Sequence, residues 1–279
     1  MTHQLVQSLR NRYKRWDRTN ALTKRQQFVV ITGVLTGFLM LTQLVSPDLR
    51  YPMVVLLSVL AYGLCAFGLR DDLKGSEWIT LLTLPTFFTA AVAVFYFLLP
   101  TRWLTRLPVA MLYAVGMYAL LLTENIYNVA ASRTIALLRA AHSVGFLLTL
   151  ATYYLLVQTV MAYRLSPFLN VALVSLITYP LTVQILWAME LTDRIGKRVT
   201  DLGLIITVVI AELAWIFSFW PVRTTLFALF LTTSFYGLAG LAQQYLTERM
   251  YKRTVWEFFG VVCIVFIILM ITANWYSAL

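Results

Sequence analysis

Residues 51–69 read YPMVVLLSVLAYGLCAFGL and carry no charged side chain between Arg50 and Arg70. A helix needs about 20 predominantly apolar residues to cross the ~30 Å hydrocarbon core of a bilayer, and this run has that length. A transmembrane strand would instead alternate apolar and polar residues over about ten positions. The run therefore predicts a membrane-spanning helix and argues against a transmembrane barrel.

Runs of the same kind fill most of the chain. Of its 279 residues, 60% are hydrophobic and 12% are charged, with a mean hydropathy of +0.77. Soluble domains carry about 25% charged residues, so an ordinary soluble enzyme is excluded. The pattern predicts an all-α, polytopic transmembrane bundle of eight or nine spans, which forms one domain over residues 28–279 behind an N-terminal arm at 1–27. The expected spans are 28–45, 51–69, 78–99, 108–128, 136–162, 168–190, 200–218, 222–245 and 254–275.

The basic residues are distributed unevenly between the two sides of this bundle. If the N-terminus is cytoplasmic, 17 of the 22 Lys and Arg residues lie inside and five lie outside. Because positive charge resists translocation, this asymmetry predicts a cytoplasmic N-terminus, a C-terminus outside, and a multi-pass protein of the cell (inner or plasma) membrane. The same asymmetry accounts for the net charge of +10, so no nucleic-acid partner is expected.

The N-terminal arm has the pattern of a basic amphipathic helix. Arg10, Lys14 and Arg18 fall opposite an apolar stripe of Leu5, Leu9, Tyr13 and Trp16. Such a helix would lie on the anionic inner leaflet of the bilayer. The alternative is a plain stretch of positive charge that only sets the orientation.

The four predicted outer loops each combine proline with arginine: SPDLRYP, LPTRWLTRLP, YRLSP and FWPVR. Proline ends helices, so the simpler interpretation is a set of tight turns with arginines at the lipid headgroups. The other interpretation is a functional ring of outer arginines that binds an anionic group. Its members would be Arg50, Arg102, Arg106, Arg164 and Arg223.

Two prolines lie in the middle of expected spans and are candidate helix breaks. Pro85 ends the segment TLLTLP and Pro180 ends the similar segment SLITYP. Paired broken helices are typical of secondary transporters built from inverted repeats. Two ordinary proline kinks within continuous helices are the alternative.

The most polar stretch near the membrane is the hairpin LLTENIYNVAASRTIALLRAAHS at 121–143. It supplies the candidate pathway or helix-pairing residues Glu124, Asn125, Asn128, Arg133, Arg139 and His142. A buried carboxylate is costly unless it is paired, so Glu124 is expected to bind Arg133 or Arg139. These six residues would act in a substrate or ion pathway, or they would lock the two helices of the hairpin together.

Glu212, in TVVIAELAWIF, is the acidic residue nearest the middle of a span and has no Lys or Arg close to it in sequence. An ionisable group at this depth is expected to face the interior of the bundle. It would serve proton or cation coupling, or a hydrogen-bonded helix contact, with Gln43, Gln158, Tyr179 and Gln184 as available partners.

Motifs of known chemistry are missing from the sequence. Its two cysteines, Cys65 and Cys263, show no metal-binding or disulfide spacing, and there is no HExxH, GxSxG or P-loop motif. We therefore expect no metal and no cofactor, and enzymatic activity is not predicted.

The segment LLTENIYNVAASRTIALLRAAHSVGFLLTL at 121–150 resembles a family of uncharacterised multi-pass membrane proteins from small-genome bacteria, described only as a domain of unknown function. The elements TENIYN and RTIALLRAA carry the resemblance. It implies an integral inner-membrane protein in which this hairpin is the distinctive part, and it implies no reaction or ligand.

Three hypotheses follow for the function. The first is a transporter or permease component for a small solute, ion or lipid precursor. The second is a non-catalytic membrane subunit or scaffold that binds a membrane protein partner. The third is a membrane enzyme that acts on a lipid-linked substrate, with Glu124 or His142 as the base and arginines on the phosphate. A water-filled cavity would favour transport, and a dry interior would favour the scaffold.

Overall fold

The computed structural model describes residues 23–42, 49–70, 75–99, 103–130, 137–192 and 194–273. Within these ranges the chain forms nine α-helices and no strand, which confirms the predicted all-helical bundle. Residues 1–22 of the predicted amphipathic arm lie outside the described residues. The helices are α2 (Lys24–Leu41), α3 (Arg50–Leu69), α4 (Glu77–Leu98), α5 (Trp103–Ala130), α6 (Leu138–Ala162), α7 (Pro167–Glu190), α8 (Lys197–Phe217), α9 (Thr224–Leu246) and α10 (Lys252–Thr272).

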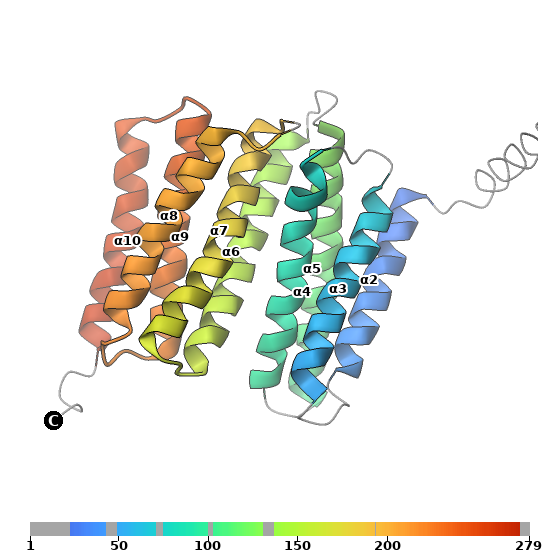
Figure 1. Cartoon of the computed structure of the whole chain (residues 1–279), viewed down its shortest axis with the longest axis horizontal. Helices are drawn as coiled ribbons and strands as arrows, with labels where there is room; N and C mark the ends of the chain where they lie inside the picture. The colour runs from blue at the N-terminus through green and yellow to red at the C-terminus, as the bar shows by residue number, and fades with distance from the viewer. Residues whose placement is uncertain are drawn as a thin grey trace, which may run out of the picture.

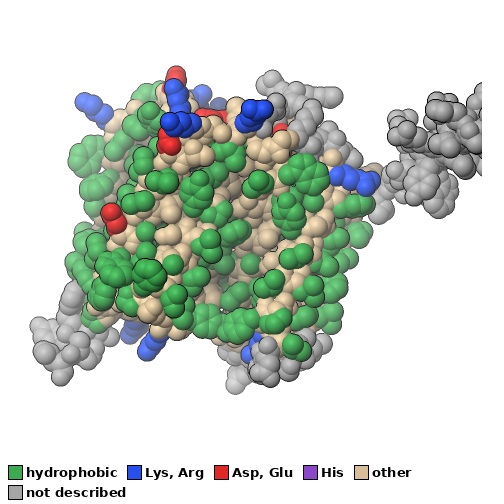
Figure 2. All heavy atoms as spheres, in the orientation of Figure 1, with side chains coloured by type: hydrophobic (Ala, Val, Ile, Leu, Met, Phe, Trp, Pro, Cys, Tyr) green, Lys and Arg blue, Asp and Glu red, His purple; other side chains and the backbone are tan. Residues whose placement is uncertain are grey.

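Consecutive helices run in opposite directions, so the bundle has two ends (Figure 1). The upper end in Figure 1 holds the start of α2 at Lys24 and the last residues of α3, α5, α7 and α9. The lower end holds the last residues of α2, α4, α6, α8 and α10. Most charged side chains lie at these two ends, and apolar side chains cover the flank between them, with one acidic side chain among them at the left edge (Figure 2).

Eight of the described helices, α3 to α10, are long and apolar enough to cross a membrane. The chain is therefore a polytopic membrane protein. Helix α2 is not among these eight candidate spans. The number of spans agrees with the prediction of eight or nine.

Helices α4, α6, α7 and α9 form the interior of the bundle, where they contact one another. Helices α2, α3 and α5 lie on one flank, and α8 and α10 lie on the other (Figure 1). The edge helix α10 buries only Leu269 among its described residues and packs against α9. Most of its surface is therefore exposed on the outside of the bundle.

Helix ends depart from the prediction where capping or proline was misjudged. The helix α2 begins at Lys24 instead of residue 28, because the Thr23 N–H donates to Gln26 Oε1 at 2.9 Å in a capping arrangement that the sequence TKRQ encodes. The helix α5 begins at Trp103 instead of residue 108 and contains Pro108.

Of the two interpretations of Pro85 and Pro180, the one in which they break their helices is wrong, and the alternative of prolines within continuous helices is confirmed. The helices α4 and α7 run continuously through them. Threonine hydroxyls nearby donate to carbonyls one turn back, from Thr89 to Pro85 at 2.8 Å and from Thr182 to Thr178 at 2.7 Å. The prolines are accommodated inside regular helices, as transmembrane helices often allow.

Candidate functional site

The last two turns of α5, at the upper end, carry a cluster of polar side chains. Glu124 and Asn128 are four residues apart and share one helix face, and their exposed fractions are 0% and 1%. Asn125, on a neighbouring face, is half-buried. Helix α5 thus carries a carboxyl and a carboxamide group into the protein interior about 9 Å and 3 Å, respectively, from its end at Ala130, given a rise of about 1.5 Å per residue.

Glu124 is held by an amide group of α7. The Gln184 Nε2 atom donates to Glu124 Oε1 at 3.3 Å, and Gln184 is itself 3% exposed. The other carboxyl oxygen, Glu124 Oε2, has no hydrogen-bond partner. The predicted ion pair with Arg139 is wrong, because Arg139 is exposed on α6 and makes no salt bridge with Glu124. Arg133 lies outside the described residues.

Three other side chains of this region donate to main-chain carbonyls near helix ends. Asn128 Nδ2 donates to Leu69 O of α3 at 3.0 Å, and Tyr127 Oη donates to Ala141 O of α6 at 2.9 Å. His142 Nε2 lies 2.8 Å from Ala188 O of α7 and acts as the donor, because a carbonyl oxygen only accepts. These bonds tie α3, α5, α6 and α7 together at the upper end.

A polar cavity of about 400 Å³, which we call the upper cavity, opens at the same end. It lies between the first turns of α6, the last turns of α9 and the end of α7. It is lined by Leu138, Arg139, His142, Ser143, Phe146, Met189, Gln243, Gln244, Thr247 and Arg249. The buried Gln243 Nε2 has no hydrogen-bond partner among the described residues.

A second polar cavity of about 630 Å³, the lower cavity, opens at the opposite end of the same helices. It lies between the end of α6, the start of α7, the end of α8 and the start of α9. It is lined by Met161, Arg164, Leu165, Asn170, Phe217, Ser218, Trp220, Val222, Arg223, Thr224, Thr225 and Phe227. The buried Asn170 Oδ1 has no partner among the described residues.

The two cavities share one sign of charge. Arg139 and Arg249 line the upper cavity together with His142, and Arg164 and Arg223 line the lower cavity. No Asp or Glu is found in the lining of either. Both cavities therefore suit an anion, which arginine binds through charge-assisted hydrogen bonds.

Packed side chains separate the cavities at mid-height. The rings of Tyr153 on α6 and Phe235 on α9 are stacked with their centroids 4.4 Å apart, and both are 0% exposed. Tyr153 Oη is 3.0 Å from the Thr178 hydroxyl of α7. Each of these residues lies near the middle of a helix whose two ends line the two cavities. The α6–α7–α9 interface is thus open at both ends and closed between them.

The prediction that Glu212 faces the bundle interior is wrong. Its side chain is exposed on the outer face of α8, beside an apolar groove of about 460 Å³ that we call the Glu212 groove. Besides Glu212, the groove is lined by Val171, Val208, Ala211, Trp215 and Ile216. No ion pair or hydrogen bond joins Glu212 to another described residue.

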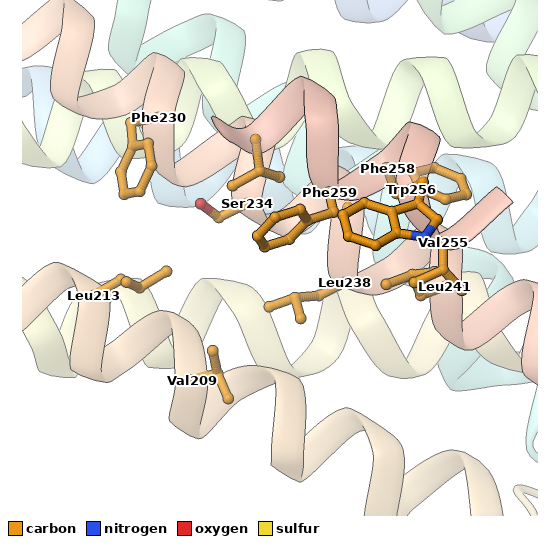
Figure 3. A pocket seen from close by; sticks show the side chains of 12 residues that line it. Val209, Leu213, Phe230, Ser234, Leu238, Leu241, Val255, Trp256, Phe258 and Phe259 are labelled. Carbon is orange, nitrogen blue, oxygen red and sulfur yellow. The ribbon is translucent and has the colours of Figure 1, made fainter. Parts of the chain in front are cut away.

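A further apolar groove, of about 430 Å³, lies where α8, α9 and α10 meet. Figure 3 shows Leu213, Leu238 and Phe259 turned toward it and Ser234 as a hydroxyl at its wall. No charged side chain lines the groove, so a ligand would be held there mainly by apolar contacts and by the shape of the groove. An acyl chain of the bilayer matches that chemistry.

Within the described residues, no three His, Cys, Asp or Glu side chains come close enough together to hold a metal ion. Sequence reasoning also missed the residues that shape the cavities, namely Gln243, Arg249, Asn170 and the Tyr153–Phe235 stack. The sequence did indicate Arg139 and His142 of the upper cavity, through the polar hairpin, and Arg164 and Arg223 of the lower cavity, through the proline and arginine pattern of the predicted outer loops.

A family model described as "Protein of unknown function (DUF5656)" matches residues 71–272. The matched region contains the hairpin of Glu124 and both cavities, so it extends far beyond the segment that carried the resemblance. No curated protein and no solved structure matches the chain.

Proposed function

Since the chain belongs to DUF5656, a family of unknown function, we propose a function from its own geometry: it is a permease component of the cell membrane that moves a small anion along the α6–α7–α9 interface. The observation that carries this proposal is the placement of two arginine-lined cavities at opposite ends of one interface. An opening at each end and a closed middle give a solute access from both sides without a continuous leak across the membrane, and a rocking motion of the helices around the closed middle would complete the passage.

The charges of the cavities specify the class of solute. An anion that leaves water for the membrane loses hydration worth many kcal/mol, and only fixed positive charge or hydrogen-bond donors replace it. Arg164 and Arg223 supply both at the lower cavity, and Arg139 and Arg249 supply both at the upper one. Basic cavity walls also raise the local anion concentration.

Uptake into lipid vesicles tests this proposal. Purified protein is reconstituted, and radiolabelled chloride, sulfate, inorganic phosphate and acetate are each offered from outside. We expect uptake of at least one anion above protein-free vesicles. The variant Arg223→Ala should lower it about tenfold or more, because a hydrogen bond to a charged group contributes about 1.5–3 kcal/mol.

The control is Arg253→Ala, since Arg253 is exposed on α10 and pairs with Glu257 at 3.0 Å, away from both cavities. Uptake should stay at the wild-type level in this variant. Absence of uptake for all four anions, or equal loss in the two arginine variants, would contradict the proposal.

A second candidate function is that of a membrane subunit, and the position of Glu212 favours it. A carboxyl group on the lipid-facing surface is costly unless a partner supplies positive charge or a donor. Glu212 lies five positions before the end of α8 at Phe217, about 7.5 Å along the helix axis. This distance puts it deeper in the membrane than the headgroups. We propose that the Glu212 groove receives a transmembrane helix of another protein that presents Lys or Arg at this depth.

Photo-crosslinking in native membranes tests the subunit proposal. A photoreactive phenylalanine analogue replaces Val208, which lines the groove one helical turn from Glu212. We expect crosslinks to one transmembrane segment that contains Lys or Arg, with a yield that falls when Glu212→Gln is added. Crosslinks to lipid alone or to a second copy of this chain would contradict the proposal. So would a crosslinking yield that stays the same when Glu212→Gln is added.

A further inference from the structure

The interior around Glu124 contains an excess of hydrogen-bond acceptors. Glu124 Oε2, Gln184 Oε1 and Asn128 Oδ1 are all buried and all lack a hydrogen-bond partner among the described residues. The three side chains are 0%, 3% and 1% exposed. Buried polar groups normally find partners, so three oxygen acceptors without a donor in one region require an explanation.

The orientations of the two amide groups are set by their neighbours. Gln184 Nε2 donates to Glu124 Oε1, and Asn128 Nδ2 donates to Leu69 O. A carbonyl oxygen only accepts, and so does an ionised carboxylate, so exchanging the amide oxygen and nitrogen of either side chain would set two acceptors against each other. The unpartnered atom of Asn128 is therefore an oxygen, and that of Gln184 is an oxygen when Glu124 is ionised, which is the state that a bound cation requires.

These oxygens belong to one small region of the bundle. Glu124 and Asn128 lie one helical turn apart on the same face of α5, where side chains four residues apart are neighbours. Gln184 reaches Glu124 from α7, and each of these two residues lies six residues before the end of its helix at the upper end. Helix α3 adds the carbonyl of Leu69 through its bond with Asn128.

The chemistry of the three oxygens selects the ligand. A water molecule would donate to them but would leave the carboxylate charge uncompensated. One carboxylate balances one positive charge, and the neutral amide oxygens add ligands without adding charge. Hard cations prefer such oxygen donors, whereas transition metals favour His and Cys.

We propose that Glu124, Gln184 and Asn128 form a buried site for one dehydrated monovalent metal cation of the sodium class. The site is separate from the two arginine-lined cavities, whose linings include none of the three residues. The proposal stands or falls on cation binding alone, whether or not the protein moves anions.

The test is binding of radioactive sodium to the purified protein in detergent, together with its thermal midpoint Tm. Sodium chloride is compared with choline chloride at equal ionic strength. We expect saturable binding of about one sodium ion per chain and a higher Tm in sodium. The variant Glu124→Gln should abolish both effects. Gln184→Met, which keeps the side-chain length and removes the oxygen, should weaken binding about tenfold or more.

The matched control is Glu212→Gln, which removes a carboxyl from the outer face of α8 and should leave sodium binding unchanged. If Glu124→Gln fails to fold, Gln184→Met and Asn128→Ala decide the question, because each removes one ligand and leaves the carboxylate in place. Equal Tm in sodium and choline, binding that survives Glu124→Gln, or satisfaction of the site by a proton without bound sodium would overturn the proposal.

Discussion

At the scale of single residues, the polar side chains of the hairpin at 121–143 bind main-chain groups at helix ends more often than they bind one another. Asn128 and His142 reach carbonyls close to the ends of α3 and α7, where the last turn of a helix leaves carbonyls without intrahelical partners. Glu124 differs, because its contact is the side chain of Gln184, 60 residues away. The sequence identified Glu124 as notable but offered no way to select Gln184 among several polar residues within spans.

The bond from Asn128 to Leu69 predicts a measurable loss of stability. We expect Asn128→Ala to lower the free energy of unfolding by about 1 kcal/mol, because a buried carbonyl loses its donor. Thermal or denaturant unfolding in detergent, in choline salts so that sodium is absent, measures it. Asn125→Ala is the control, since the Asn125 Oδ1 atom has no hydrogen-bond partner to lose. Equal destabilisation in both variants would contradict this role.

At the scale of helices, the spacing of small and apolar residues in α8 decides which of its faces is buried and where Glu212 lies. Its buried residues recur every three or four positions, and the closest packing uses Gly203, where an added Cβ would lie 3.0 Å from Val183 of α7. Glu212 follows buried Ile210 by two residues, about 200° around the helix, and so falls on the opposite side. The small residues Gly203 and Ala214 on the buried face could have indicated this orientation, whereas hydropathy alone could not, because α8 is apolar on most of its faces.

The apolar runs predicted the positions of the helices well, but they did not predict which face of each helix is buried. Bilayer thickness sets the length of a span, but neither neighbours nor kinks follow from it. Thus the predicted spans 51–69 and 168–190 differ from α3 and α7 by one residue at most. The cavities depend on which ends of α6, α7 and α9 meet, and that information lies in contacts between distant residues.

The contact between α9 and α10 is tightest at Gly240 of α9. A Cβ atom at Gly240 would lie 2.4 Å from the ring of Phe258, so Gly240→Leu should displace α10 from α9. We expect a stability loss of about 1–3 kcal/mol from overpacking and faster thiol labelling of the half-buried Cys263 on α10. Gly260→Leu on α10 is the control, because nothing lies within 4 Å of its added Cβ. Unchanged labelling in Gly240→Leu would contradict this packing.

At the scale of the whole molecule, the orientation inferred from charge and the two cavities together predict opposite accessibility. In a variant without Cys65 and Cys263, Ser143→Cys places a thiol in the upper cavity and Thr225→Cys places one in the lower cavity. A membrane-impermeant maleimide applied to intact cells should label Thr225→Cys only, and applied to inverted vesicles it should label Ser143→Cys only. Labelling of both thiols from one side would contradict the assignment of the ends.

The central claim is that the α6–α7–α9 interface is the path of an anion and that the Tyr153–Phe235 stack closes it. The most direct test is the efflux rate, from preloaded vesicles, of the anion that the wild-type protein transports, measured for the variant Tyr153→Ala. Tyr118→Ala on α5, away from this interface, is the control. We expect faster efflux for Tyr153→Ala and a wild-type rate for Tyr118→Ala. Unchanged efflux from folded Tyr153→Ala, or an equal rise in both variants, would contradict it.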